Sequence, residues 1–267
     1  MKAYIVDSFT KEPFRGNPAG VCLLQNEPGT EKMLTIAQEF GLSETAFIQQ
    51  TAKNNTYSIR YFSPKKEIAL CGHATLASAK VIFKNTGVDE IHFITTENLD
   101  LPVKQRDEEI IMEFPIYDTI AATAPLSMLE ALGLKEVIHI SYSPKNKILV
   151  LEINGTHLLA NLHPDFKALV SSHNNINGVL VTAQSEDLEY DYHYRYFWPW
   201  AGTDEDPVTG GVQTFLAKYW STRLNKKIMN AFQSSSRTGY MKIELGTEKV
   251  LIISHAVIIF EGDLVVF

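Results

Sequence analysis

Three ionisable side chains stand at points of the sequence where acid–base chemistry could be assembled: Glu44, His73 and Asp206. Glu44 lies among small and apolar neighbours, while His73 and Asp206 each flank a glycine-containing turn. Each also has a structural explanation: an isolated carboxylate such as Glu44 usually caps a helix or faces solvent, an acidic run such as 204–206 is more often a solvated turn, and a lone histidine is more often structural. Carboxylates and an imidazole together favour proton transfer to and from a substrate. Spacing alone permits the three side chains to share one site but does not require it.

The glycines of the two turns indicate where a ligand would bind. Gly72 lies before one predicted helix, and Gly210 and Gly211 lie before another. The first N–H groups of a helix have no partner within it, and the helix dipole favours an anion there. Glycine also lets a ligand come close to the backbone. We expect two anion-binding turns suited to a small carboxylate; the alternative is that the glycines only permit tight packing.

Several other chemistries are disfavoured by missing motifs. The sequence has no Gly-x-Gly-x-x-Gly, no phosphate-binding loop and no Gly-x-Ser-x-Gly nucleophile elbow. It has neither His-Glu-x-x-His nor a pair of Cys-x-x-Cys motifs, and its eight histidines are scattered. Proton chemistry without a metal or an organic cofactor is therefore the economical hypothesis.

The elements that must position these residues are mostly short strands. Two helices are predicted in the first half: 30–40, with apolar residues at helical spacing and Gly41 as a C-terminal cap, and the Ala-rich 74–83. Strand-like runs bounded by turn residues surround them, at 2–6, 20–24, 47–50, 57–62, 90–95, 101–105 and 110–114.

The second half follows the same order after a composition change at 115–125, which resembles a linker. A helix is predicted near 127–132 and a second at 212–219, and strands at 147–153 and 178–182 and up to 197. Strands are expected to continue to the end of the chain.

An internal repeat explains this order. Arg-Tyr-Phe-x-Pro occurs at 60–64 and again at 195–199, an offset of 135 residues. Each copy precedes a glycine turn and a helix, and the turns at 71–73 and 209–211 are offset by 138 residues. We interpret the chain as two similar halves, each a sheet around one apolar helix. A cleft between two such domains is a common place for a small-molecule site.

Composition excludes several classes of protein. The chain has 267 residues, of which 45% are hydrophobic and 21% charged, as is typical of a globular protein. The net charge of −7 disfavours nucleic-acid and polybasic membrane partners. Two cysteines are too few for a disulfide scaffold, and the N-terminus lacks the apolar run of a secretory signal. We expect a cytoplasmic protein with free thiols and no membrane span.

The motifs together resemble the phenazine-biosynthesis isomerase family (PhzF-like). They occur in the family's order over nearly the whole chain: Asp-Ser-Phe at 7–9, Phe-Arg-Gly-Asn-Pro-Ala-Gly at 14–20, Ser-Glu-Thr-Ala-Phe at 43–47, Leu-Cys-Gly-His-Ala-Thr at 70–75 and Glu-Asp-Pro-Val-Thr-Gly at 205–210. The resemblance implies an α+β, diaminopimelate-epimerase-like fold of two pseudo-symmetric domains, each a β-barrel around a central helix. We place these at 1–116, completed by the last C-terminal strand, and 117–267. A homodimer is also implied.

The resemblance implies cofactor-independent isomerisation by proton transfer, and it assigns roles to residues of this sequence. Its catalytic glutamate, histidine and aspartate match Glu44, His73 and Asp206, and the residues lining its site match Asn17, Gly72 and Gly210. We add the neighbouring turn residues as substrate-binding: Cys71, Thr209 and Gly211. We expect Glu44 to remove and return the proton, with burial raising its pKa from about 4.3 toward 6–7. His73 and Asp206 would orient a small carboxylate-containing substrate, held by the backbone at the two glycine turns.

Two departures from the related proteins bear on the reaction. Phenazine-type members commonly carry serine where this chain has Gly211, so a hydroxyl is missing near the substrate. Related epimerases use two cysteines, whereas here Cys71 has Thr209 as its counterpart. Threonine is no acid or base at neutral pH, which disfavours a thiol-based epimerase. The remaining alternative is a binding or sensor protein that uses the site without turnover.

Overall fold

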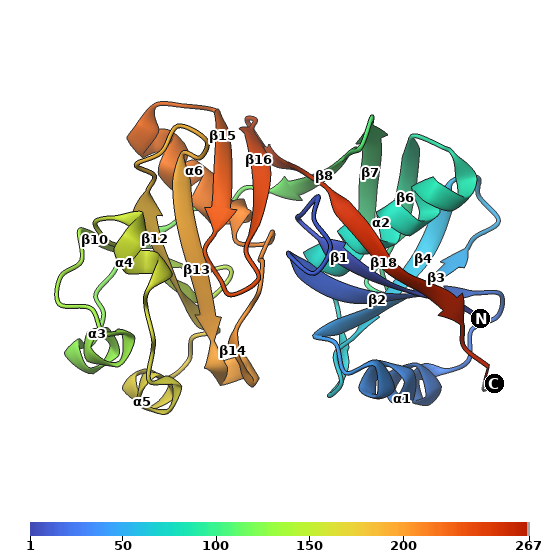
Figure 1. Ribbon diagram of the computed structural model, residues 1–267, viewed down its shortest axis with the longest axis horizontal. Helices are drawn as coiled ribbons and strands as arrows, with labels where there is room; N and C mark the ends of the chain where they lie inside the picture. Colours follow the sequence, from blue (N-terminus) through green and yellow to red (C-terminus); the bar gives the residue numbers. More distant parts are fainter. Residues whose placement is uncertain (266–267) are drawn as a thin grey trace. The chain divides into compact units, whose positions relative to one another are not determined.

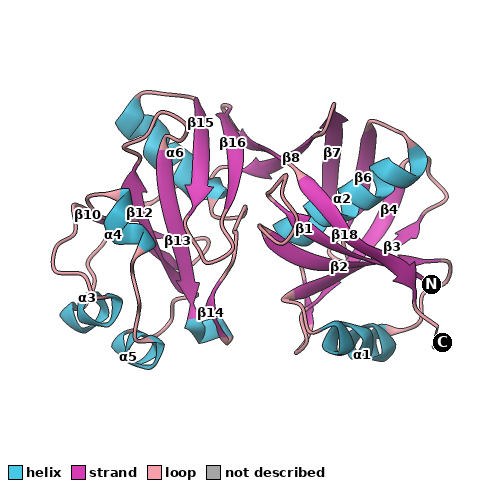
Figure 2. Ribbon diagram, in the orientation of Figure 1, coloured by secondary structure: helices cyan, strands magenta, loops and turns pink. Residues whose placement is uncertain are grey.

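The computed structural model describes residues 1–265, and the chain divides into two compact units. Unit 1 comprises residues 1–114 and the segment that begins at Leu251, and unit 2 comprises Pro115–Val250. Each unit consists mostly of strands around few helices (Figures 1 and 2). Among the described residues, no helix is long and apolar enough to cross a membrane.

Unit 1 holds two helices and most of its strands in its N-terminal segment. The helices are α1 (Thr30–Phe40) and α2 (Gly72–Thr86). The strands are β1 (Lys2–Ser8), β2 (Asn17–Leu24), β3 (Glu44–Gln50), β4 (Thr56–Phe62), β5 (Glu67–Ile68), β6 (Glu90–Ile94), β7 (Asp100–Arg106) and β8 (Glu109–Pro115), with β17 (Lys249–Ser254) and β18 (Ala256–Asp263) from the C-terminal end.

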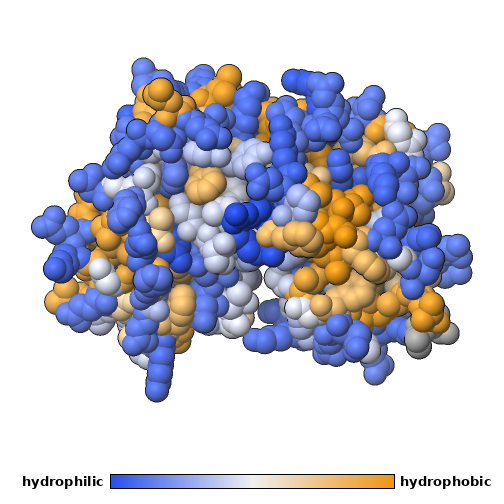
Figure 3. Space-filling model, viewed as in Figure 1, coloured by the Kyte–Doolittle hydropathy of each residue, from blue (hydrophilic) through white to orange (hydrophobic). Residues whose placement is uncertain are grey.

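These strands form a mixed sheet. β1 pairs antiparallel with both β2 and β18, β2 pairs parallel with β3, and β3 pairs antiparallel with β4. β4 pairs parallel with β6, which continues antiparallel through β7 to β8, and β8 pairs with β17. We expected this sheet to close into a barrel around the central helix, and that closure stays a prediction. In the view of Figure 3, apolar side chains gather where β18 lies, and Phe260 of that strand is exposed.

Helix α2 packs against β1, β2, β3 and β18, and ten of its fifteen residues are buried. This burial explains why its sequence is Ala-rich, since small side chains let the helix lie close to the strands around it. α1 is amphipathic instead and buries only Met33, Ile36 and Ala37. Both helices end at a glycine with left-handed backbone, Gly41 and Gly87.

Unit 2 repeats the order of elements. Its helices are α3 (Leu126–Leu132), α4 (Thr156–Ala160), α5 (Phe166–Ser172) and α6 (Gln213–Leu224), with a 3₁₀ turn at Pro199–Ala201. Its strands are β9 (Ile120–Ala121), β10 (His139–Ser143), β11 (Ile148–Glu152), β12 (Gly178–Gln184), β13 (Tyr192–Trp198), β14 (Thr203–Glu205), β15 (Ile228–Gln233) and β16 (Gly239–Leu245).

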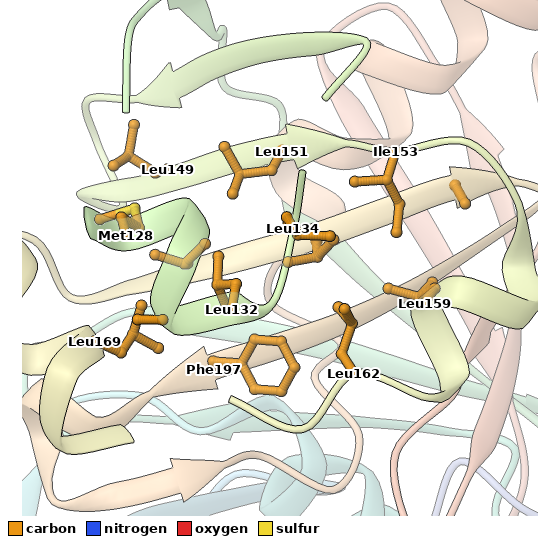
Figure 4. Packing of buried hydrophobic residues seen from close by; sticks show 14 of the residues in the cluster. Met128, Leu132, Leu134, Leu149, Leu151, Ile153, Leu159, Leu162, Leu169 and Phe197 are labelled. Atoms are coloured by element: carbon orange, nitrogen blue, oxygen red, sulfur yellow. The ribbon is translucent and has the colours of Figure 1, made fainter. Parts of the chain in front are cut away.

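The pairing in unit 2 follows that in unit 1. β10 pairs antiparallel with β11, β11 parallel with β12, and β12 antiparallel with β13. β13 pairs parallel with β15, which continues antiparallel to β16. The core between these strands and the helices is apolar, and Met128 and Leu132 of α3 lie among the side chains of β11 (Figure 4).

The two copies of Arg-Tyr-Phe also form the same local structure. Arg60 at the end of β4 makes two hydrogen bonds to the carboxylate of Glu67 in β5, at 2.8 and 2.7 Å. Arg195 in β13 makes two to Glu205 in β14, both at 2.7 Å. Each guanidinium also lies over the ring of the phenylalanine two residues later. The sequence repeat therefore corresponds to a repeated hairpin.

Most predicted elements exist, with shifted ends. The helix predicted at 30–40 has those bounds, while the helix predicted at 74–83 begins at Gly72 and the one predicted at 212–219 continues to Leu224. The composition change at 115–125 begins where the two units meet in sequence, since the first segment of unit 1 ends at Phe114. The segment contains β9, and the amide of Tyr117 donates to the carbonyl of Thr214 at 2.7 Å. Short elements such as β5, β14 and α4 were not predicted.

Candidate active site

Five predicted site residues come together in unit 1. Asn17 and Glu44 are the first residues of β2 and β3, which are paired in parallel. Cys71 directly precedes α2, and Gly72 and His73 are the first residues of that helix. Because α2 packs against both strands, its N-terminal side chains reach the point where the strands begin.

Glu44 and His73 form the centre of this cluster. Oε2 of Glu44 lies 3.2 Å from Nε2 of His73, and each side chain is less than a tenth exposed. At the other ring nitrogen, Nδ1, the sulfur of Cys71 lies 3.4 Å away and the amide nitrogen of Asn17 lies 3.3 Å away. The imidazole therefore stands between a carboxylate and a thiol. The alternative of a solvated or capping Glu44, weighed from sequence, is wrong, because the residue is a buried strand residue.

Two serines that we had not assigned to the site also hold this group. The hydroxyl of Ser8 donates to the carbonyl oxygen of His73 at 2.8 Å, and the hydroxyl of Ser43 lies 3.4 Å from Nε2 of that ring. Both serines belong to the family motifs at 7–9 and 43–47. Their place within these motifs was the one feature of the sequence that could have assigned them to the site. A serine alone carries no such signal, because hydroxyls usually bond to nearby backbone.

The loop that connects β1 to β2 lies between two residues that contact His73. It begins after Ser8 and ends before Asn17, and both of these residues contact His73. Within the loop Phe14 has a φ of 66°, which a bulky residue adopts only when its surroundings impose it. Gly16 also has a φ of 66°, and a Cβ there would lie 2.0 Å from the carbonyl oxygen of Ser8. The loop is thus tightly determined beside the cluster.

The structure reverses our expectation of a raised pKa for Glu44. Burial by itself raises this pKa, but hydrogen bonds from His73 and Ser43 and the charge of His73 together hold it below the ordinary 4.5. Burial also opposes a charge on His73, yet Cys71 and Glu44 together raise its pKa well above 6.5. The two groups stabilise each other's charged forms. Near neutral pH the pair is a carboxylate and an imidazolium, which burial alone did not predict.

The thiol of Cys71 differs from its neighbours. Burial raises its pKa, the carboxylate of Glu44 adds to this, and the opposing effect of His73 does not compensate. The free thiolate is therefore disfavoured, and the thiolate is the reactive form of cysteine. Cys22 lies in the apolar core beside α1, and burial raises its pKa to about 12.

The remaining predicted residues form a second group, in unit 2. Asp206 is buried, and its carboxylate accepts a hydrogen bond from the hydroxyl of Thr209. Gln233 of β15 joins the two: its amide nitrogen donates to the carbonyl of Asp206 at 2.6 Å, and its amide oxygen accepts from the backbone N–H of Thr209 at 2.7 Å. The hydroxyl of Tyr194 donates to the carbonyl of Thr209 at 3.1 Å. Gln233 and Tyr194 were missed, because nothing in the sequence links them to residues 206–209.

Gly210 and Gly211 follow this group and precede α6. Their carbonyls accept hydrogen bonds from the amides of Gln213 and Thr214, at 3.0 and 3.3 Å. A Cβ at Gly211 would meet no atom within 4 Å, so space does not require glycine there. Neither α2 nor α6 has a side chain that caps its first turn. The first amides of α6 instead donate to backbone carbonyls, so an anion at this end would meet the N–H groups of the glycine turn and not those of the helix itself.

The structure therefore assembles two groups of predicted residues, one in each unit. Glu44, His73, Cys71, Gly72 and Asn17 meet in unit 1, and Asp206 meets Thr209 beside the glycines in unit 2. Our expectation that Asp206 shares a site with Glu44 and His73 stays a prediction.

The fold and the site define a class of protein. The family model for phenazine biosynthesis-like proteins, PhzC-PhzF, matches residues 6–262, and the chain belongs to this family. A phenazine biosynthesis protein of the PhzF family from Enterococcus faecalis has a solved structure that matches with a TM-score of 0.92 and 32% identity, covering 99% of both chains.

Two further comparisons concern the sequence and the fold. An uncharacterized isomerase of Halalkalibacterium halodurans is 36% identical over 265 residues, covering 98% of this chain and 97% of that one. The structure of a predicted epimerase from Pseudomonas aeruginosa matches with a TM-score of 0.75 at 17% identity, covering 100% of this chain and 99% of that one. At that identity the match shows a shared fold. The resemblance recognised in the motifs is confirmed.

Proposed function

We propose that this protein is an isomerase that moves a proton within a small carboxylate-containing metabolite and needs no cofactor. Membership of the PhzC-PhzF family supports an isomerase, as does the isomerase of Halalkalibacterium halodurans among its relatives. The observation that carries the proposal is the buried pair of Glu44 and His73, with 3.2 Å between Oε2 and Nε2. The carboxylate of Glu44 is in the form that accepts a proton, and the imidazolium of His73 is in the form that stabilises a negative charge.

In the proposed reaction Glu44 accepts a proton from a carbon of the substrate. The negative charge that remains on the substrate is stabilised by the imidazolium of His73, whose attraction to Glu44 ends when the carboxylate is protonated. Glu44 then returns the proton to a different position on the same molecule. Substrate and product therefore contain the same atoms, and no oxidant or second reactant is consumed.

The glycine turns and the unit 2 group complete the proposed site. N–H groups at Gly72, where α2 begins, and in the turn at Gly210 and Gly211 before α6 would bind the substrate carboxylate. Asp206, oriented by Thr209 and Gln233, would accept hydrogen bonds from the substrate or carry a proton to it. This arrangement requires that both units act on one molecule, in the interdomain cleft that we expect from the repeat.

Hydrogen exchange tests the reaction even while the product is unidentified. Candidate carboxylate metabolites are incubated with the protein in D₂O, and deuterium incorporation at carbon is followed by NMR. Glu44→Gln should slow exchange by about 10²–10⁴-fold, the usual contribution of positioned acid–base catalysis. Glu39→Gln, an exposed position on α1, is the matched control and should exchange normally. Unaltered exchange in Glu44→Gln would remove this residue from the mechanism.

The same assay separates the alternatives. A metabolite that binds but never exchanges would favour the sensor protein, for which the absent hydroxyl at Gly211 is the supporting feature. A thiol-based epimerase would lose its activity in Cys71→Ala, whereas the proposed mechanism retains Glu44 as its base. The homodimer implied by the family resemblance stays a prediction, and sedimentation equilibrium tests it.

A further inference from the structure

The cluster of Glu44, Cys71 and His73 contains the three side-chain types that bind transition metals in proteins. One ligand atom from each lies within 4.8 Å of the other two, and all three residues are buried. In the part of the chain that the structure describes, no second group of three such residues meets this criterion. In the proposed proton transfer the sulfur neither accepts the proton nor bears the charge that stabilises the substrate.

Two of the three separations between ligand atoms are close to those of a tetrahedral zinc site. With usual metal–ligand bond lengths, tetrahedral geometry requires about 3.3 Å between nitrogen and oxygen and about 3.6 Å between nitrogen and sulfur. Nε2 of His73 lies 3.2 Å from Oε2 of Glu44 and 3.9 Å from Sγ of Cys71. The sulfur lies nearer to Nδ1, at 3.4 Å, and within 4.8 Å of the carboxylate oxygen, so the side chains of Cys71 and His73 must turn toward each other to bring all three atoms onto one ion.

We propose that Glu44, Cys71 and His73 bind one thiophilic divalent cation, of which Zn²⁺ is the type, and that the bound ion switches the site off. A carboxylate and a thiolate together balance the two positive charges, so the occupied site is neutral and suits a buried position. Sulfur, nitrogen and oxygen ligands in one set select Zn²⁺ or Co²⁺ over Mg²⁺, which requires oxygen ligands.

The inhibitory effect rests on the proposed function, but the binding does not. A carboxylate that coordinates an ion cannot accept a proton from carbon, and a coordinated imidazole no longer carries the charge that stabilises the substrate. Asn17 can support either state with its amide oxygen, because Nδ1 carries a proton both in the imidazolium and in a neutral imidazole that binds an ion through Nε2. The geometry thus permits two exclusive uses of one set of side chains.

Binding is tested with Co²⁺ alone, because cobalt bound to a thiolate gives a charge-transfer absorption that carboxylate or imidazole ligands do not give. The intact reduced protein should bind one Co²⁺ per chain with this absorption, and Zn²⁺ should displace it stoichiometrically. Cys71→Ala should abolish the band, while Cys22→Ala, the matched control in the core, should retain it. Glu44→Gln should weaken binding by at least about 10-fold, since even residues that only support a metal ligand cost ~10–100-fold when changed.

The proposal fails if the reduced wild-type protein gives no thiolate band, or if the band survives in folded Cys71→Ala. Circular dichroism establishes folding of each variant, and the wild-type titration remains decisive where a variant does not fold. Loss of binding with normal D₂O exchange would overturn the metal site alone. Normal binding without exchange for any metabolite would count against the proposed isomerase alone.

Discussion

Oε2 of Glu44 and Nε2 of His73 lie 3.2 Å apart, although one residue begins strand β3 and the other lies in the first turn of helix α2. Each side chain is less than a tenth exposed, so solvent screens their attraction little. The pKa of the carboxyl is lowered and that of the imidazole is raised well above its ordinary value. The site therefore holds a base and an acid in their charged forms together.

This ion pair should make the free energy of unfolding depend on pH in both directions. Because the pKa of Glu44 is lowered by folding, its contribution is present above the ordinary 4.5 and is lost as pH falls through the folded pKa. Because the pKa of His73 is raised, its contribution is present below the ordinary 6.5 and is lost as pH rises through the folded value. The pair therefore stabilises most between those two ordinary values.

Urea unfolding of wild-type protein and Glu44→Gln, with a chelator present, measures this effect. The difference in stability should be largest between pH 4.5 and 6.5, at about 1–3 kcal/mol for a lost buried hydrogen bond to a charged group. It should shrink toward higher and lower pH. A difference that does not change across this range would show that the two groups are not an ion pair.

Gly16→Ala should disturb the site through the loop that carries Ser8. A Cβ at this position would lie 2.0 Å from the carbonyl oxygen of Ser8, whose hydroxyl holds the backbone of His73. Gly41→Ala is the matched control: its φ of 63° is nearly the same as the 66° of Gly16, but its Cβ would lie 4.0 Å from the nearest carbonyl oxygen, that of Gln38. Both variants carry left-handed strain of about 1–2 kcal/mol.

We expect Gly16→Ala to be about 1–3 kcal/mol less stable than Gly41→Ala, because overpacking adds to the shared strain. Thermal unfolding compares the two, and D₂O exchange should slow only in the first. Equal stability of Gly16→Ala and Gly41→Ala would mean that the loop accommodates the added Cβ without displacing Ser8.

Gly211→Ser should be tolerated and should supply the hydroxyl that phenazine-type members carry. A Cβ there meets no atom within 4 Å, so the change in stability should stay within about 0.5 kcal/mol. Gly178→Ser is the contrasting variant, because its Cβ would lie 2.6 Å from both the carbonyl of Phe197 and the ring of Tyr196. Thermal unfolding distinguishes them, and a large loss in Gly211→Ser would contradict the open space. If Gly211→Ser changes which metabolites exchange fastest in D₂O, the hydroxyl at this position contributes to substrate specificity.

The sequence predicted those helices and strands whose residue pattern lies entirely within the element. The helix at 30–40 has its predicted bounds because apolar spacing and the left-handed Gly41 act inside about eleven residues. Strands of two or three residues, such as β5 and β14, have too few positions to show alternation. They exist because hairpin partners and the Arg60 and Arg195 ion pairs hold them, which is information from outside the strand.

The sequence predicted which residues form the site, but it did not predict the direction of their pKa shifts. Motif resemblance gathered Glu44, Cys71 and His73, and the structure brings them within contact. The sign of the pKa shift depends on whether burial or a neighbouring charge dominates, and this requires the distance to His73. Gln233 was invisible for a similar reason, since its link to Asp206 is created by the position of β15 in the sheet.

Gln233→Leu should loosen the unit 2 group. This buried amide makes two hydrogen bonds to backbone, at 2.6 Å to the carbonyl of Asp206 and at 2.7 Å from the N–H of Thr209. Leucine leaves both backbone groups unsatisfied, at about 1–3 kcal/mol each. Urea unfolding measures the loss at a pH where a glutamic acid at 233 is protonated, so that Gln233→Glu keeps the acceptor for Thr209 and offers a hydroxyl donor to Asp206, and should lose less. Equal losses in the two variants under this condition would show that neither bond contributes.

The repeated hairpin gives the last comparison, Arg195→Lys against Arg60→Lys. Both arginines pair with a hairpin glutamate, but Nη1 of Arg195 also donates to the carbonyls of Leu159, Ala160 and Leu162, at 3.2, 3.3 and 2.8 Å. Lysine cannot reproduce a planar fork that bonds a carboxylate and several carbonyls at once. Arg195→Lys should therefore cost about 2–4 kcal/mol, since hydrogen bonds to charged groups contribute ~1.5–3 kcal/mol each.

The pair at Arg60 is more exposed: its side chain is 16% accessible, and its partners Glu67 and Glu27 are 28% and 50% accessible. Solvent screening should limit the cost of Arg60→Lys to about 1 kcal/mol. Thermal and urea unfolding of both variants decide the matter. A cost for Arg60→Lys as large as that for Arg195→Lys would mean that the hairpin ion pair, and not the three carbonyls, is what each copy of the motif contributes to its unit.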